Sequence, residues 1–222
     1  MESISSINIQ KITNNPLLHN QRVFSPCYAI TSANHETINY IDENLQSLKK
    51  RIIDDYESTP RGKYGKFQKW QTKSTPLMEA VVNIKSTTTM KELEELKNKL
   101  ESQFNCEILQ VSKHMDEGKF IITDEITQHE YFVERGDNHK FMSIEDNQVV
   151  EHTMIEPDGT KIEIKGKIRR DFNYHAHLII NKYNFSEHKN TRWKPHEMEA
   201  MQTMVAKQLN MVRGIKGSTT KR

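Results

Sequence analysis

The residues best placed by type and spacing to do chemistry are His175 and His177. They open an apolar run that predicts a strand over residues 172–181. Because side chains alternate between the two faces of a strand, residues two apart share a face. Two imidazoles on one face of a rigid element are half of a metal site. The alternative interpretation is a pair of polar residues on a sheet face that meets solvent.

A third histidine, His114, ends another predicted strand and is followed by Asp116 and Glu117. Strand ends present functional groups on a rigid support. If this strand lies beside the one with the histidine pair, three imidazoles can converge on one divalent ion. Such an ion keeps open positions for phosphate oxygens and can act on them as a Lewis acid. Either acidic residue could orient a ligand imidazole through its other ring nitrogen, or serve as a further ligand or proton acceptor.

Basic side chains are concentrated in short stretches, although the formal net charge is only +2. In the first of these stretches, residues 61–73, aromatic residues are interleaved with cations. This pattern is typical of single-stranded nucleic-acid binding, in which rings stack on bases and cations follow phosphates. A solvated surface is the alternative for any one stretch. The predicted DNA-binding residues are Arg61, Lys63, Tyr64, Lys66, Lys69 and Trp70, with Arg192 and Lys194 from the basic carboxyl-terminal region.

Composition indicates a folded α/β protein of 222 residues with charged surfaces and clustered apolar segments. No apolar run approaches the roughly 18 residues that span a bilayer. The amino terminus has neither the basic start nor the apolar run of a secretory signal. Cys27 and Cys106 are too few for a disulfide framework, so we expect two reduced thiols in a cytoplasmic protein.

Periodicity and turn signals predict the order of elements. The strand, helix, strand order at 77–114 predicts two strands that are parallel or that straddle a neighbour. The final helix is predicted to begin at Pro195, to carry Val212 on its apolar face and to end at Gly214. In chain order, we expect a strand at 4–12, an ordered loop at 17–24, a helix at 36–56, a loop at 58–75, a strand at 77–85, a helix at 90–104, a strand at 106–114, short strands between 119 and 166, and a strand at 172–181.

Three motifs together resemble those of one enzyme family. His114-Met-Asp-Glu-Gly118 and Asn173-Tyr-His-Ala-His177 resemble the His-x-Asp-Glu and His-x-His motifs of plasmid mobilisation relaxases. These relaxases belong to the HUH single-strand endonucleases, and the most similar branch is the MobV or Pre type. His19-Asn-Gln-Arg22 resembles the His-Asn-x-Arg motif near the amino terminus of that branch. In the family the first two motifs lie a few residues apart, whereas here a predicted β-rich excursion separates them.

The resemblance implies an HUH-type α/β (α+β) fold, with a central, mostly antiparallel sheet and helices packed on one face. We expect one relaxase domain over 1–222, a β-hairpin insertion at 119–170 and a chain that continues beyond Arg222. The implied activity is metal-dependent, site- and strand-specific nicking of plasmid DNA at an origin of transfer, with covalent attachment to the 5′ phosphate. The implied cofactor is Mn²⁺ or Mg²⁺. The implied partners are single-stranded and supercoiled plasmid DNA and the conjugation machinery of a bacterial mobile element.

The resemblance also implies roles for single residues. His19 would be the nucleophile, and Arg22 would clamp the phosphate. Glu117 would adjust the properties of the metal site, and Asp116 would support the metal ligands without itself binding the metal. Tyr28 and Tyr40 are the alternative nucleophiles, because many HUH enzymes use tyrosine. The implied metal ligands are His114, His175 and His177.

Other functions fit parts of the same sequence. A rolling-circle replication initiator of the same superfamily would use the same motifs, and a non-catalytic single-strand-binding plasmid protein would use the same basic stretch. An iron oxygenase would use His114, Asp116 and His175 as its ligands. The helices predicted ahead of the motifs, and the second histidine of the pair, argue against the oxygenase. A protein that only binds DNA would not need the full set of histidines.

Overall fold

The computed structural model describes residues 4–12, 16–22, 26–31 and 34–214 of the chain. These residues divide between two compact units. The first unit is drawn from Met1–Gln21, Glu36–Lys113 and His175–Arg222, and the second from Arg22–His35 and His114–Tyr174. Among the described residues, no helix combines the length and the apolar character needed to cross a membrane.

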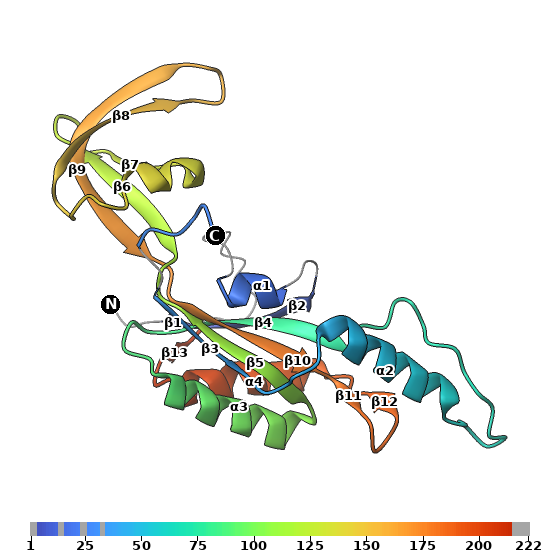
Figure 1. The fold of residues 1–222 in the computed structure, drawn as a ribbon. Coiled ribbons are helices and arrows are strands. Elements are labelled where there is room, and N and C mark those ends of the chain that lie inside the picture. Colours follow the sequence, from blue (N-terminus) through green and yellow to red (C-terminus); the bar gives the residue numbers. More distant parts are fainter. Residues whose placement is uncertain (1–3, 13–15, 23–25, 32–33, 215–222) are drawn as a thin grey trace. The chain divides into compact units, whose positions relative to one another are not determined.

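A five-stranded sheet forms the centre of the first unit (Figure 1). Its strand order is β2-β4-β10-β5-β3, and β4 pairs antiparallel with both β2 and β10. The strands predicted at 77–85 and 106–114 therefore straddle a neighbour, which is β10. The predicted fold class, a mixed α/β fold around a central antiparallel sheet, is confirmed. The strands are β2 (Ile7–Lys11), β3 (His35–Asn39), β4 (Leu77–Asn83), β5 (Glu107–His114) and β10 (His175–Asn181).

Two long helices, α3 (Met90–Phe104) and α4 (Pro195–Gln208), lie side by side on one face of this sheet, and the short helix α1 (Pro16–Asn20) lies on the other (Figure 1). The sequence predicted α3 well. Its start is a capping box in which Thr89 and Glu92 satisfy each other's backbone groups, and its end is Asn105 in the left-handed conformation with φ 46°. Its leucines, four residues or fewer apart, are buried as a single stripe.

The helix predicted at 36–56 is wrong in its first half. Residues His35–Asn39 form strand β3, and the helix α2 spans Leu45–Ser58. Asn44 caps it by accepting a hydrogen bond from the Ser47 backbone nitrogen at 2.9 Å. The adjacent strand β5 draws the earlier residues into the sheet, where the Tyr40 backbone nitrogen donates to the Leu109 carbonyl oxygen at 2.8 Å. Helical spacing of the apolar residues thus continued by chance across a strand and a loop.

Smaller corrections concern the two ends of the chain. The predicted first strand is two strands, β1 (Ile4–Ser5) and β2, because each pairs with a different neighbour. The predicted loop at 17–24 begins as helix α1, with a proline at its first turn, and residues 23–25 lie outside the described residues. Val212 does not belong to the last helix. Asn210, at φ 47°, ends that helix, and β13 (Val212–Arg213) pairs in parallel with β1.

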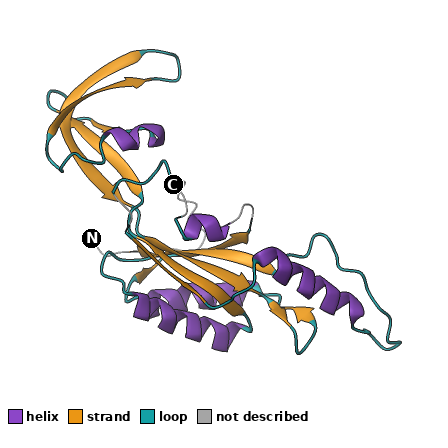
Figure 2. Cartoon of the chain, viewed as in Figure 1, coloured by secondary structure: helices purple, strands orange, loops and turns teal. Residues whose placement is uncertain are grey.

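The second unit is an antiparallel sheet, whose strands are drawn in orange in Figure 2. It has four strands in the order β7-β6-β9-β8. It is larger than the predicted hairpin insertion, because β9 extends well past the predicted 161–164 and pairs with both β6 and β8. Phe120, Ile122, Ile164 and Ile168 form its buried core together with Ile30. Its elements are β6 (Gly118–Asp124), β7 (Glu130–Phe132), the 3₁₀ helix η1 (Arg135–Lys140), β8 (Val149–Ile155) and β9 (Lys161–Phe172).

Candidate functional site

Polar side chains are buried on the α1 face of the first unit's sheet. Gln110 and Ser112 of β5 are both 0% exposed, and so is Asn20 of α1. Burial of polar groups is unfavourable unless they are hydrogen-bonded. Asn20 Nδ2 donates to Gln110 Oε1 at 2.8 Å, and Thr37 Oγ1 donates to Ser112 Oγ at 3.0 Å. This network fixes α1 against the sheet and places the preceding residue, His19, over the same face.

The two histidines of β10 share one face of their strand, as predicted, and it is the face that carries α1. His175 and His177 are 4% and 8% exposed, and their ring centroids are 4.9 Å apart. The His19 ring contacts the His177 ring edge to face, with centroids 5.3 Å apart and an interplanar angle of 74°. The ligand nitrogens of His19 and His177 lie within 4.8 Å of each other. The first unit by itself therefore gathers three of the four histidines of the motifs into one cluster.

Glu79 of β4 is a member of this site that the sequence analysis missed. Its Oε1 lies 2.9 Å from His177 Nδ1, and both side chains are nearly buried. Burial opposes ionisation of Glu79, but the hydrogen bond and the charge of His177 outweigh it and lower the Glu79 pKa. A carboxylate at Nδ1 holds a proton there and directs the lone pair of the ring to Nε2, as in metal-ligating histidines. The only signal in the sequence was a single acidic residue inside an apolar strand.

The second unit contains a buried charged cluster around Arg22. The Arg22 fork donates from Nε to Asp116 Oδ2 at 3.0 Å and from Nη2 to Asp116 Oδ1 at 2.9 Å. Arg22 also forms an ion pair with Glu117, and all three side chains are at most 10% exposed. Burial alone would lower the Arg22 pKa, but the two carboxylates raise it. His114, fully buried, has its Nδ1 2.9 Å from Glu117 Oε1.

This arrangement bears on two predicted roles. Glu117 orients the His114 imidazole through Nδ1, the relation expected for a carboxylate behind a metal ligand. Arg22 was predicted to clamp a phosphate with its fork, but in this structure the fork grips Asp116. Its Nη1 atom is buried and has no hydrogen-bond partner among the described residues. The role of Arg22 toward phosphate therefore stays a prediction that rests on Nη1.

The long excursion leaves the ends of the two histidine motifs adjacent. Gly118 pairs with Phe172 in the β6–β9 ladder, and the Asn173 backbone nitrogen donates to the Glu117 carbonyl oxygen at 2.9 Å. Gly118 is needed there, because a Cβ atom would lie 2.3 Å from the Asp171 carbonyl oxygen. The insertion thus departs from and returns to the same point, because Glu117 and Asn173, at its two ends, are hydrogen-bonded to each other.

The two alternative nucleophiles hold their protons firmly. Burial, together with the charge of Glu117, raises the Tyr28 pKa. Burial and a hydrogen bond to Glu94 raise the Tyr40 pKa to about 12. The Lys97 ammonium makes a cation–π contact with Tyr40, at 4.5 Å from the centroid of its ring. The pKa of each phenol is thus raised, although the Arg22 charge and hydrogen bond oppose the shift at Tyr28.

The predicted DNA-binding residues fall into two groups, apart from Lys194, which precedes α4. Arg61, Trp70 and Arg192 line one cavity of the first unit. The others are exposed on the loop that follows α2, where Tyr64 is 78% exposed. This second group consists of Lys63, Tyr64, Lys66 and Lys69.

Comparison with solved structures finds a similar fold in a relaxase domain. The matches are two Mn-bound crystal structures of the MobM relaxase domain (MOBV; Mob_Pre), each bound to plasmid pMV158 oriT DNA. The one determined at pH 6.8, with 22 nucleotides and a 3′-thiophosphate, has a TM-score of 0.54 and 13% identity over 99% of this chain and 94% of its own. The one determined at pH 4.6 has a TM-score of 0.53 and 14% identity over 99% of this chain and 95% of its own. No protein-family model and no curated protein matches the sequence.

Proposed function

We propose that this chain is a metal-dependent relaxase that nicks one strand of plasmid DNA at an origin of transfer. The observation that carries the proposal is the contact of the His19 ring with the buried His175–His177 pair. A potential nucleophile beside two potential metal ligands is the arrangement that phosphodiester cleavage requires. The fold shared with Mn-bound, oriT-bound relaxase domains supports this assignment.

We infer that His114 joins His175 and His177 as a ligand of one divalent ion. Strand periodicity puts His114 on the same face of β5 as Ser112, and β5 is the neighbour of β10. The chain gives independent support. His114 is bonded to Glu117, whose carbonyl accepts from Asn173, and His175 follows two residues later. Three imidazoles suit Mn²⁺ less than oxygen ligands do, but they leave open positions for phosphate and water.

The carboxylates fit a metal site as well. Glu79 and Glu117 each hold the Nδ1 of one imidazole, which presents Nε2 as the donor atom. A bound divalent ion would polarise the scissile phosphate and stabilise the charge that develops on it. We propose Mn²⁺ or Mg²⁺ for this position, and the Mn-bound relaxase structures favour Mn²⁺.

We propose His19 as the nucleophile. A lone pair on one ring nitrogen attacks phosphorus, a P–N bond forms and the P–O3′ bond breaks. The proton lost from the other ring nitrogen balances the proton that the departing 3′ oxygen takes up. The products are a 5′-phosphoramidate on His19 and a free 3′ hydroxyl, so the chain can later reverse the step and rejoin the strand. Arg22 Nη1 is the remaining donor of the Arg22 cluster that could contact a phosphate oxygen.

The test of the activity is plasmid relaxation. The protein is incubated with Mn²⁺ or Mg²⁺ and a supercoiled plasmid that carries the origin flanking its own gene. We expect relaxed product from the natural chain and from His129→Ala, which changes an exposed histidine, and none from His175→Ala. Absence of relaxation, or equal relaxation by His175→Ala, would refute the proposal. DNA binding that persists without relaxation would instead indicate a non-catalytic binding protein.

The test of the nucleophile is the covalent adduct on a denaturing gel with a labelled oligonucleotide. An adduct through nitrogen is labile in acid and stable in alkali, and it disappears in His19→Ala. An acid-stable adduct that survives in His19→Ala and disappears in Tyr28→Phe would assign the attack to tyrosine instead.

A further inference from the structure

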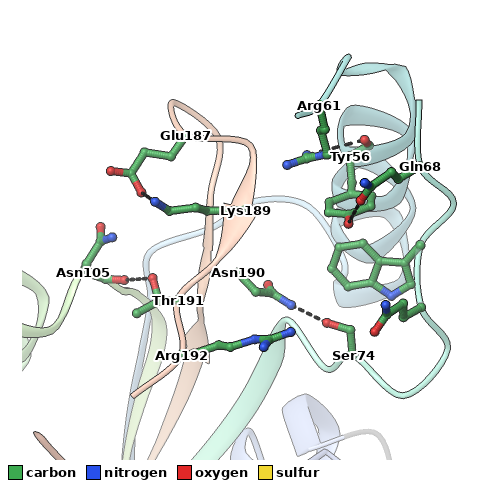
Figure 3. Close-up of a pocket in the computed structure, with 12 residues that line it drawn as sticks. Tyr56, Arg61, Gln68, Ser74, Asn105, Glu187, Lys189, Asn190, Thr191 and Arg192 are labelled. Carbon is green, nitrogen blue, oxygen red and sulfur yellow. Dashed lines mark hydrogen bonds and ion pairs between the residues drawn. The ribbon is translucent and has the colours of Figure 1, made fainter. Parts of the chain in front are cut away.

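A cavity of about 690 Å³ lies in the first unit, and none of the clustered histidines lines it (Figure 3). Its walls come from the end of α2 (Leu45–Ser58), from the loop after that helix, and from the short hairpin β11 (Tyr183–Asn184) and β12 (Lys189–Asn190). Its volume is in the range of small-ligand sites, which is about 300–1,000 Å³. Three of the eight predicted DNA-binding residues line it, namely Arg61, Trp70 and Arg192.

The aromatic wall of the cavity is rigid. Trp70 meets the Tyr56 ring at 5.0 Å and 86° and the Tyr183 ring at 6.1 Å and 59°. Its backbone nitrogen donates to Glu57 Oε1 at 2.8 Å. Asp55 ties the helix to the hairpin, because it accepts from Tyr183 Oη at 2.5 Å. A ring held in this way can stack on a planar ligand with little loss of conformational entropy.

The opposite wall offers polar groups. Asn190 Nδ2 donates to Ser74 Oγ at 2.6 Å, a contact that Figure 3 shows across the cavity. Asn190 Oδ1 is buried and accepts no hydrogen bond among the described residues. A buried acceptor without a donor is unfavourable, and an N–H group of an entering ligand would relieve it. Gln68 and Gln71 line the cavity on the aromatic side, from the loop that carries Trp70, and add two further amides.

Positive charge completes the lining. Arg61, Lys189 and Arg192 are opposed by one carboxylate, that of Glu187, so three positive charges and one negative give a formal charge of +2. Glu187 is 2.9 Å from Lys189, and the Arg61 guanidinium lies 3.9 Å from the centroid of the Tyr56 ring. Arg192 forms no ion pair among the described residues. Its charge is therefore available to an anionic ligand.

We propose that this cavity holds one unpaired nucleotide of the bound DNA strand. The base lies against Trp70 and bonds to the Asn190 amide, and the phosphate beside it meets Arg192. A site for phosphate alone would have cations or backbone N–H groups at its centre, whereas here a ring and amides line the cavity with the cations. The inference rests on the proposed function in requiring DNA as the ligand. It adds a pocket that reads a base, separate from the exposed cationic loop.

The test uses Trp70 as its own reporter. The chain has two tryptophans, and Trp193→Phe leaves Trp70 as the only one. The probes are 20-nucleotide dA, dC and dT homopolymers and an abasic 20-mer with the same backbone charge. We expect at least one homopolymer to quench Trp70 fluorescence, and the abasic strand not to. Loss of base stacking typically weakens binding roughly 5- to 150-fold, so the abasic strand should bind more weakly by a factor in this range.

Variants locate the effect. Binding by the variants is followed through the fluorescence anisotropy of a labelled strand, since Trp70→Phe removes the reporter. Asn190→Ala and Trp70→Phe should weaken binding of the quenching homopolymer several-fold and leave abasic binding unchanged, while Asn98→Ala, at an exposed asparagine of α3, should change neither. Equal quenching by the abasic strand, equal losses for both strands in Asn190→Ala, or no binding of any 20-mer would overturn the inference. Plasmid relaxation is measured on the same preparations. Base-dependent quenching without plasmid relaxation would support the nucleotide pocket and refute the nicking activity. Plasmid relaxation without base-dependent quenching would support the nicking activity and refute the pocket.

Discussion

Glu79 gives the sharpest test of the proposed metal site, because its bond to His177 is visible in the structure and Glu79 is absent from the motifs. Glu79→Gln keeps the size of the side chain and removes its charge. The 2.9 Å hydrogen bond to His177 Nδ1 then becomes a neutral one, or reverses if the amide nitrogen faces the ring. Reversal would move the ring proton to Nε2 and abolish the lone pair that a metal needs.

The expected magnitude follows from the geometry. Hydrogen bonds to charged groups contribute about 1.5–3 kcal/mol to stability. Both side chains of this pair are only 10–12% exposed, so solvent screens the bond little. At about 1.4 kcal/mol per factor of ten, we expect Mn²⁺ affinity to fall by roughly 10- to 100-fold. Because the loss is in affinity, the relaxation rate should recover substantially at saturating Mn²⁺.

The assay is titration of Mn²⁺ with detection of the free ion by electron paramagnetic resonance. The matched control is Glu43→Gln, which removes a carboxylate from an exposed ion pair with Arg51 in the same unit. A merely structural role for Glu79 would lower the melting temperature without metal and leave the Mn²⁺ affinity unchanged. Affinity within about twofold of the natural chain would therefore refute the reasoning, since the smallest loss expected is roughly tenfold.

Three further predictions concern the rest of the molecule. Arg22→Ala removes the ion-pair partner of the buried Asp116 and Glu117 carboxylates, of which Glu117 keeps its bond to His114. The substitution should cost about 3–5 kcal/mol in urea unfolding, and a loss below about 1 kcal/mol would contradict the buried network. Burial opposes ionisation of Asp55, but its hydrogen bonds lower its pKa, so its contribution to stability is present above about pH 4 and disappears as the pH falls through the lower folded value. Between pH 5 and pH 2, the melting temperature of Asp55→Asn should therefore fall less than that of the natural chain. Burial raises the Cys106 pKa to about 12, so at pH 8 a thiol reagent should modify exposed Cys27 fast and Cys106 only after unfolding, and two fast thiols would disprove this.

Local signals determined the parts of the fold that were predicted correctly. Helix α3 has a cap, a stripe of leucines and a left-handed end, all within one stretch of sequence. The start of α2 was misplaced because Ile38 and Ile41 continue its spacing, although Thr37 and Ile38 lie in a strand paired with β5. That pairing is made with residues about 70 positions away. Single-sequence periodicity carries no information about such a neighbour.

The candidate site divides in the same way. The face shared by His175 and His177 follows from strand geometry alone, and the structure has it. Glu79 could not be assigned, because its contact with His177 depends on the antiparallel register of β4 and β10, which pairs Glu79 with Ile179 and so brings it diagonally next to His177. The fork of Arg22 could not be assigned either. A bidentate side chain fits a carboxylate as well as a phosphate, and only the fold shows which one is present.

The separation of the two histidine motifs in sequence is explained by the way the second unit closes. A tight turn and a long antiparallel excursion have the same effect on the flanking residues when the excursion is hydrogen-bonded at its base. Here the base is the Gly118–Phe172 pair together with the bond from Asn173 to Glu117. Gly118 permits the close approach, since a side chain would collide with the backbone of the returning strand. Gly118→Ala should therefore strain both the base of the excursion and the apolar cluster of the second unit, because the added Cβ atom would also lie 2.6 Å from Ile30 Cδ1, and a melting temperature equal to that of the natural chain would contradict this account.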